Sequence, residues 1–309
     1  MLPSLVEAVG RTPLVRLART DARFGEGITL WAKLEWFNPG GSVKDRAARQ
    51  MLTEALADGR LKPGGTVIDS TSGNTGIAYS WLCAALGLKC VLVMPENVTH
   101  GRKAFTRTLG AEIVYSDPLE GSDGAILKAQ ALVRAEPDRR FYPDQYSNPA
   151  NPRAHELGTA REIWAQTGGA VTHFVAGIGT TGTVMGTGRG LKALSPSVQV
   201  LAVEPDDGLH GLEGLKHLAS SIRPAIWQPE GVVDEILPIG TEAGWDESER
   251  LLREEGLAVG HSGGAALAGA LRVAQRLHEA GEPGTIVTLF PDRADRYFEA
   301  GVWDPSQTW

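Results

Sequence analysis

Four loops rich in glycine or hydroxyl side chains hold the residues of this sequence that could do chemistry. In the first, from Asn38 to Arg46, a Pro-Gly-Gly turn opens a predicted helix, and Lys44 falls in its first turn. The helix dipole is positive there, so it lowers the pKa of the amine and helps that amine capture an aldehyde as a Schiff base. The competing interpretation is a solvated lysine whose long stem leaves the field.

The second loop, from Ser70 to Gly76, gathers hydroxyls, an amide and backbone N–H groups at a predicted helix start. Such a cluster forms an anion site that suits a phosphate or a carboxylate. An ordinary N-cap needs one Ser, Thr or Asn, whereas several polar residues gather here. The pattern therefore favours ligand binding over simple capping.

The third loop follows an apolar run and has the pattern G-x-G-x-x-G from Gly177 to Gly182. This pattern after a strand is typical of dinucleotide binding, and Glu204 ends the next apolar run, roughly where a ribose-binding acid would lie. A dinucleotide pyrophosphate does not require three hydroxyls, but a compact phosphate gains a charge-assisted bond from each threonine. The three threonines within residues 180–183 therefore favour a terminal phosphate monoester, and a nicotinamide dehydrogenase stays as the alternative.

The fourth loop, from Val259 to Ala265, places Ser262 among glycines before another predicted helix. A small polar residue at such a position can contact a flat ring edge-on. Taken without the other loops, Ser262 would be interpreted as an N-cap.

Length and composition limit the classes of protein to consider. A chain of 309 residues can form one large or two medium domains, and its net charge of −7 leaves no basic footprint for nucleic acid or an anionic membrane. Cys83 and Cys90 have neither CxxC nor zinc spacing, so we expect buried thiols and no metal site. The first residues do not resemble a signal peptide and no stretch has transmembrane length, which predicts a cytoplasmic protein.

The elements that must position these loops alternate regularly along the chain. Strand-like runs at residues 30–32, 66–68, 91–93, 113–115, 174–176, 198–203 and 286–290 are followed by helical stretches, except where the chain ends. Two of these helices are expected from about Lys44 to Leu56 and from near Asn74. The β-then-α order predicts an α/β fold of mostly parallel, twisted sheets covered by helices.

Two segments lack helical or strand patterns. The stretch from Tyr142 to Pro152 is rich in Pro and Asn and is the best candidate for a boundary between two lobes. The turn-rich zone from Pro205 to Gly231 is interpreted either as a mobile loop over a site or as a plain surface excursion.

In combination, the four loops resemble the pyridoxal-phosphate (PLP) enzymes of fold type II, the tryptophan synthase β superfamily. Within it the sequence is most similar to the cysteine synthase family, in particular its cysteine synthase B (O-acetylserine sulfhydrylase B) branch. The matching motifs occur in the family's order, at residues 10–15, 33–35, 38–46, 71–76, 144–149, 179–183 and 295–297.

This resemblance implies a role for each loop. Lys44 would bond the cofactor aldehyde and later act as acid and base at the substrate α-carbon. The other implied contacts are Asn74 with the ring's phenolic oxygen, Gly179, Thr180, Thr181, Gly182 and Thr183 with the phosphate, Ser262 with the pyridine nitrogen, and Thr71, Ser72, Gly73, Thr75 and Gln145 with the substrate. It also implies a homodimer, a smaller mobile lobe at 40–146 that carries the carboxylate loop, and a larger phosphate-binding lobe at 1–39 and 147–309.

The implied reaction is β-replacement. O-acetyl-L-serine would lose its β-substituent to leave an aminoacrylate, to which sulfide would add to give L-cysteine. Ser262, a neutral hydroxyl, would disfavour a long-lived quinonoid and so favour this elimination. The alternatives are a cystathionine β-synthase-type replacement with a larger thiol, a dehydrogenase using the Gly177–Gly182 pattern, and a non-catalytic binding scaffold.

Three positions depart from the family pattern. Gly263 stands where a Ser or Thr is frequent, with His261 ahead of it, and packing is the preferred interpretation of that histidine. Pro291 replaces a cysteine of the B branch, which puts thiosulfate use in doubt. Lys216 stands where O-acetylserine enzymes have a small residue and phosphoserine-using relatives an arginine, so Lys216 either pairs with a substrate phosphate or is a solvated lysine on a mobile loop.

Overall fold

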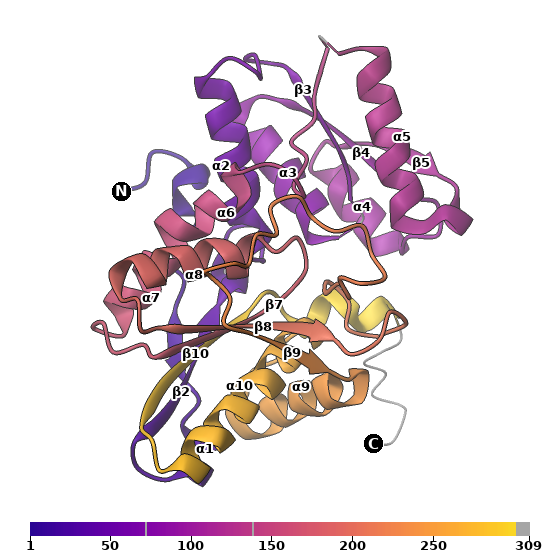
Figure 1. The fold of residues 1–309 in the computed structure, drawn as a ribbon. Coiled ribbons are helices and arrows are strands. Elements are labelled where there is room, and N and C mark those ends of the chain that lie inside the picture. The colour runs from indigo at the N-terminus through magenta and orange to yellow at the C-terminus, as the bar shows by residue number, and fades with distance from the viewer. Residues whose placement is uncertain (72, 138, 301–309) are drawn as a thin grey trace.

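The computed structural model describes residues 1–71, 73–137 and 139–300, and their strands form two sheets (Figure 1). The strands are β1 (Leu14–Arg16), β2 (Ile28–Leu34), β3 (Thr66–Ser70), β4 (Lys89–Pro95), β5 (Glu112–Ser116), β6 (Arg140–Phe141), β7 (His173–Gly177), β8 (Gln199–Pro205), β9 (Glu235–Ile239) and β10 (Gly284–Phe290). The larger sheet has the order β1-β2-β10-β7-β8-β9 and the smaller β5-β4-β3-β6. Only β1 pairs antiparallel, so the predicted α/β fold with two mostly parallel sheets is confirmed.

Helices cover both sheets, as parallel sheets require. They are α1 (Ala18–Asp21), α2 (Lys44–Ala57), α3 (Asn74–Leu86), α4 (His100–Thr108), α5 (Gly121–Ala135), α6 (Ala150–Ala154), α7 (Ala160–Gln166), α8 (Gly182–Leu194), α9 (Thr241–Glu255) and α10 (His261–Ala280). In Figure 1, α9 and α10 lie below the larger sheet, and α7 and α8 lie above it. The helices expected from Lys44 and near Asn74 begin at those residues.

The smaller sheet buries apolar side chains on both of its faces. Val67 and Leu92 pack in one cluster with α2 and α3, whereas the neighbouring Ile68, Val91 and Val93 pack on the other side against α5. Successive strand residues point to opposite faces, so one short apolar run serves two layers. These strands are almost continuously hydrophobic because both of their faces are buried.

The carboxyl ends of strands from both sheets approach one cavity. Ser70 ends β3, Gly179 follows β7, and Pro291 follows β10, and all three line cavities that lie between the sheets. In an open parallel sheet the ligand site lies outside the carboxyl ends of the strands. Here two such edges face each other, which explains why the loops predicted to bind ligands converge.

The zone from Pro205 to Gly231 is a long connection between β8 and β9 with no helix or strand in it, and residues 213–216 line the cavity. Sequence patterns missed β1, β6 and β9, because β1 and β6 are very short and β9 contains Pro238, a residue that argues against a strand. The predicted buried thiols are confirmed, since Cys83 and Cys90 are both free and buried.

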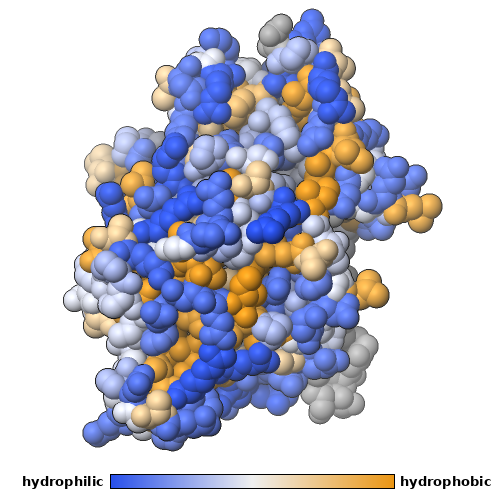
Figure 2. Space-filling model, viewed as in Figure 1, coloured by the Kyte–Doolittle hydropathy of each residue, from blue (hydrophilic) through white to orange (hydrophobic). Residues whose placement is uncertain are grey.

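The molecular surface is mostly hydrophilic on the face seen in Figure 2, with hydrophobic side chains gathered in its lower half, over the lobe of the larger sheet. Among the described residues, no helix is long and apolar enough to cross a membrane.

Candidate active site

Lys44 is the first residue of α2, and the turn before it is fixed by close contacts. Gly41 has φ +77°, a conformation that favours glycine, and the Gly40 N–H donates to Asp45 at 2.5 Å. The Trp81 indole also donates to Asp45, at 3.0 Å, so a side chain at Gly40 would collide with both groups. The Pro-Gly-Gly turn therefore anchors Lys44 while leaving its side chain free to point into the cavity.

Two lysines are deeply placed near this turn, and only one faces the cavity. Lys33 is fully buried and has three partners, namely the Thr12 carbonyl at 2.6 Å, Glu162 at 2.7 Å and Gln166 at 2.9 Å. Lys44 lines the cavity instead, and burial lowers the pKa of its amine. Of these two lysines, Lys44 alone is therefore available to a ligand.

A buried ion network holds α2 from behind. Arg46 pairs with Glu35 at 2.6 Å and with Glu162 at 2.7 Å, and Thr12 donates to Glu35 at 2.7 Å. The guanidinium holds the pKa of both carboxyls below their usual range, against the effect of burial. Because Arg46 lies two residues after Lys44, this network fixes the start of the helix that carries the lysine.

The second loop uses part of its polar groups to start α3. Thr71 Oγ1 accepts from the Gly76 N–H at 3.2 Å, and Thr75 Oγ1 donates to Gln145 Oε1 at 3.0 Å. Thr71, Gly73, Thr75 and Gln145 all line the cavity, whereas the predicted substrate-binding Ser72 lies outside the described residues. Gln145 comes from a segment about seventy residues away, which shows how the fold assembles the expected carboxylate site.

Asn74 makes a contact that sequence patterns did not predict. Its Nδ2 donates to Asp292 Oδ2 at 2.5 Å, and the Tyr297 hydroxyl donates to the same oxygen at 2.5 Å. Asp292 is 1% exposed and Tyr297 lines the cavity. A polar residue directly after the buried strand β10 was the signal that could have pointed to Asp292.

The third loop is held in a strained and closely packed conformation. Thr181 has φ +71°, which is rare for a β-branched residue, and its buried hydroxyl has no partner among the described residues. A Cβ at Gly179 would lie 2.6 Å from the Gly214 carbonyl oxygen. Asn151 Nδ2 donates to Thr180 Oγ1 at 3.1 Å, and this bond fixes the Thr180 side chain.

These features fit a phosphate group. Thr183 lies in the first turn of α8, where a helix leaves N–H groups free, and the unpartnered Thr181 hydroxyl adds a donor. The Gly182 N–H donates to Thr180 Oγ1 at 3.5 Å. His155 lies behind Thr183 at 3.4 Å, and burial lowers its pKa to about 3, so it stays neutral. The loop would therefore hold an anion through N–H groups, hydroxyls and the helix dipole.

The fourth loop places Ser262 in the first turn of α10, where it is buried. Its hydroxyl lines a narrow cavity together with Lys44 and Thr181. His261 packs between the rings of Trp245 and Tyr297, each centroid 5.5 Å away, and burial lowers its pKa to about 4. This agrees with the packing interpretation of His261.

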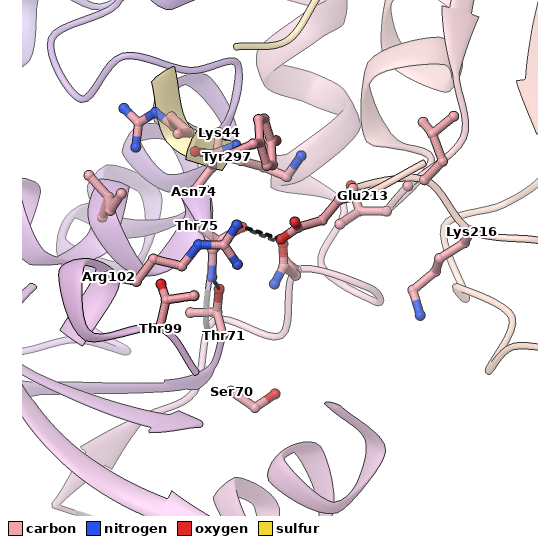
Figure 3. A pocket seen from close by; sticks show the side chains of 18 of the residues that line it. Lys44, Ser70, Thr71, Asn74, Thr75, Thr99, Arg102, Glu213, Lys216 and Tyr297 are labelled. Atoms are coloured by element: carbon pink, nitrogen blue, oxygen red, sulfur yellow. Dashed lines mark hydrogen bonds and ion pairs between the residues drawn. The ribbon is translucent and has the colours of Figure 1, made fainter. Parts of the chain in front are cut away.

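The predicted residues converge on two adjoining cavities, of which Figure 3 shows the wider. The wider, of about 650 Å³, is lined by Lys44, Thr71, Gly73, Asn74, Thr75, Gln145, Gly179, Thr180 and Lys216. The narrower is lined by Lys44, Asn74, Gly179, Thr180, Thr181, Thr183 and Ser262. The two cavities therefore share Lys44, Asn74, Gly179 and Thr180. Gly182 lines neither cavity and lies at the start of α8 beside them.

The mouth of the wider cavity carries charged side chains from both lobes. Arg102 of α4 pairs with Glu213 at 2.6 Å, and Glu213 belongs to the long connection between β8 and β9 (Figure 3). Lys216, three residues further on, lies over the ring of Tyr146 at 5.1 Å. Burial lowers the pKa of this lysine, and Asp123 opposes the shift.

Comparison with known proteins gives full-length matches. The family described as "Pyridoxal-phosphate dependent enzyme" matches residues 5–292. The chain is 48% identical to a cysteine synthase of Aquifex aeolicus, over 97% of this chain and 92% of that protein, and 42% identical to cysteine synthase B of Pseudomonas aeruginosa, over 98% of each. The solved cysteine synthase of Entamoeba histolytica superposes with a TM-score of 0.93 at 34% identity, covering 98% of this chain and 91% of that one.

Proposed function

This chain belongs to the pyridoxal-phosphate dependent enzyme family, and from that premise we propose that it is a cysteine synthase. It converts O-acetyl-L-serine and sulfide into L-cysteine and acetate, with PLP as cofactor. The observation that carries the proposal is the meeting of Lys44, the threonine loop after β7 and the carboxylate loop after β3 in one cavity system.

We assign the cofactor to the inner end of this cavity system. Lys44 would bond its aldehyde, residues 179–183 would hold its phosphate, Ser262 would meet its ring nitrogen, and Asn74 would meet its phenolic oxygen. The unpartnered hydroxyl of Thr181 and the close approach of Gly179 to Gly214 support the phosphate assignment. When bound, PLP supplies an electron sink for bond changes at the α- and β-carbons of an amino acid.

The remaining chemistry falls to side chains of this chain. Thr71, Gly73, Thr75 and Gln145 bind the substrate carboxylate, and we include Ser72 with them on the sequence motif alone. Lys44 Nζ takes the proton from the substrate α-carbon and later returns it, which burial favours because it lowers the pKa of the amine.

Measuring cysteine formed by the purified, PLP-loaded protein from O-acetylserine and sulfide tests this function directly. We expect turnover that depends on both substrates and on added cofactor. If the protein retains PLP but forms no cysteine, the assigned reaction is wrong while the cofactor assignment stands.

Lys216 supports a second substrate, O-phospho-L-serine. Lys216 lines the wider cavity, and its ammonium group lies over the Tyr146 ring and feels the charge of Asp123, but forms no ion pair among the described residues. We propose that it pairs with the substrate phosphate. Lys216→Ala should then slow turnover of O-phosphoserine but not of O-acetylserine, with the exposed Lys103→Ala as a matched control; equal slowing of both substrates would contradict the pairing.

The alternatives differ in what they leave unexplained. For the dehydrogenase, Glu204 would be the ribose-binding acid. Its carboxylate instead accepts a hydrogen bond from the Leu218 N–H at 3.2 Å and so connects β8 to the long segment that follows it. A binding scaffold would not need a cavity-facing lysine of lowered pKa. A larger thiol acceptor, as in cystathionine β-synthases, is distinguished by offering homocysteine in competition with sulfide.

We further propose a homodimer in the cytoplasm, as the family resemblance implies. The exposed hydrophobic side chains over the lobe of the larger sheet are compatible with an interface (Figure 2). The lobe boundaries at 39/40 and 146/147 also stay a prediction. The strands of the smaller sheet all fall within residues 66–141, but Val6 and Val9 pack into the core formed by α2 and α3.

A further inference from the structure

A buried carboxylate to which the proposed reaction gives no task lies where the two lobes meet. Asp292 follows β10, and its Oδ2 accepts from Asn74 on one side of the cavity and from Tyr297 on the other, at 2.5 Å each. Its Oδ1 is buried and has no hydrogen-bond partner among the described residues. Such an atom costs stability unless charge or chemistry compensates it.

The backbone brings Asp292 next to the catalytic lysine. The Val43 N–H donates to the Pro291 carbonyl at 2.9 Å, so Lys44 and Asp292 each follow one end of the same hydrogen bond. Both side chains line the narrow cavity. The ammonium of Lys44 is thus a near opposite charge for this carboxylate.

The charged and polar side chains that face Asp292 in the described structure come from three elements. Lys44 comes from α2, Asn74 from α3, and Arg296 and Tyr297 from the 3-10 helix η6 (Ala294–Ala300). Gly260, the N-cap of α10, packs closely against Asp292, since a Cβ there would collide with Oδ1. The positive end of α10 therefore lies against the carboxylate, which favours the ionised form.

We propose that Asp292 is a positioning residue that orients the carboxamide of Asn74 and stabilises the ammonium form of Lys44. The proposal rests on the proposed function only in giving Asn74 and Lys44 their roles. One N–H of the Asn74 amide is committed to Asp292, which fixes the amide plane and leaves the second N–H for a ligand.

The effect on Lys44 follows from opposing electrostatic influences. Burial lowers the pKa of the lysine, and the Asp292 carboxylate raises it. The pKa of Asp292 is itself raised, because burial outweighs the opposite effects of Tyr297, Asn74 and the nearby cations. Lys44 must both accept and return a proton, and loss of this carboxylate should lower the pKa of the amine further and so reduce the protonated fraction that can return a proton.

The cofactor-free protein tests the charge effect without any catalytic readout. The rate at which Lys44 reacts with an acylating amine reagent is followed against pH by peptide mass spectrometry, in wild type and Asp292→Asn. Asparagine keeps the size and one acceptor but removes the charge, so the pKa of Lys44 should fall by about 1 unit or more. Asp58→Asn, which removes an exposed carboxylate at the far end of α2, should leave the Lys44 pKa unchanged.

Superimposable profiles for wild type and Asp292→Asn would overturn the charge effect. The orienting effect is tested by PLP affinity of Asp292→Ala, Asn74→Ala and the double variant, with circular dichroism to verify folding. The double variant should bind PLP no more weakly than Asn74→Ala does, because the two residues act as one unit. Fully additive losses of PLP affinity would overturn the orienting effect. Cysteine formation by the wild-type protein reports separately whether the proposed function holds.

Discussion

The two ends of the cavity system are built in different ways. At the end proposed to hold the phosphate, Thr181 is 2% exposed, the Gly214 carbonyl leaves no room for a Cβ at Gly179, and Asn151 donates to Thr180. At the substrate end, the groups are side chains from both lobes, and the Arg102–Glu213 pair is 22% and 45% exposed. The end assigned to the cofactor, which remains bound through the reaction, is therefore shaped by buried backbone. The end assigned to the substrates, which bind and leave in each turnover, is shaped by partly exposed side chains.

This difference sets the size of the effects expected at each end. Interactions in a buried, low-dielectric environment are strong and costly to disturb, whereas exposed charges are screened by water and salt. Lys44 lies between the two ends and lines both cavities, so it should be the most sensitive position.

Lys44→Ala should produce the largest loss. Removing a group that works as acid and base should lower kcat by at least about 10²–10⁴-fold. Steady-state cysteine production measures this, with Lys103→Ala as a control that removes a lysine near the mouth. If Lys44→Ala keeps a tenth or more of wild-type kcat, the lysine is not the proton-transfer group.

Gly179→Ala should damage the phosphate end. The new Cβ would lie 2.6 Å from the Gly214 carbonyl oxygen, and overpacking against backbone costs about 1–3 kcal/mol. PLP affinity, measured by equilibrium dialysis, should fall by roughly 10- to 100-fold. Gly73→Ala at the substrate end is the matched control, because nothing lies within 4 Å of its added Cβ. Equal losses of PLP affinity in both variants would remove the distinction between the two ends.

Thr75→Val should affect the substrate end more weakly. It keeps the shape of the side chain but leaves the buried Gln145 oxygen without its donor at 3.0 Å, which costs about 1–3 kcal/mol. The KM for O-acetylserine should rise by about tenfold with PLP affinity unchanged, and Thr75→Ser should restore it. A fall in PLP affinity instead would mean that this loop also belongs to the cofactor end.

The Arg102–Glu213 pair should give the smallest effect. A partly exposed ion pair is worth about 0.2–1 kcal/mol, so Arg102→Ala or Glu213→Ala should change kcat/KM by no more than about fivefold. A double-mutant cycle at low and high salt measures the coupling, which salt should diminish. Coupling that is large and insensitive to salt would show that the mouth is as rigid as the phosphate end.

Local patterns were sufficient to predict most of the fold and of the loops. The starts of α2 and α3 followed from glycine turns before helical stretches, and the parallel sheets from the alternation of elements. The threonines after β7 indicated a phosphate more clearly than the G-x-G-x-x-G pattern did, because hydroxyls report on the chemistry of the ligand. Each of these signals lies within about ten residues of sequence.

Contacts between distant segments could not be predicted in this way. Asp292 meets Asn74 across 218 positions, and Arg102 meets Glu213 across the two lobes. Nothing local distinguishes these residues from ordinary polar residues at a strand end or on a helix. Similarly, Lys33 is fully buried and Lys44 partly buried, and only the tertiary structure shows that Lys33 already has three partners while Lys44 lines the cavity.

The most direct test of the assignment is to reduce the PLP-loaded protein with borohydride and to locate the modified lysine by peptide mass spectrometry. We predict a pyridoxyl group on Lys44 alone, and none in Lys44→Ala. A pyridoxyl group on Lys33, Lys216 or another lysine, with Lys44 unmodified, would contradict the assignment of the cofactor to the end of the cavity system that Lys44 and the threonine loop line.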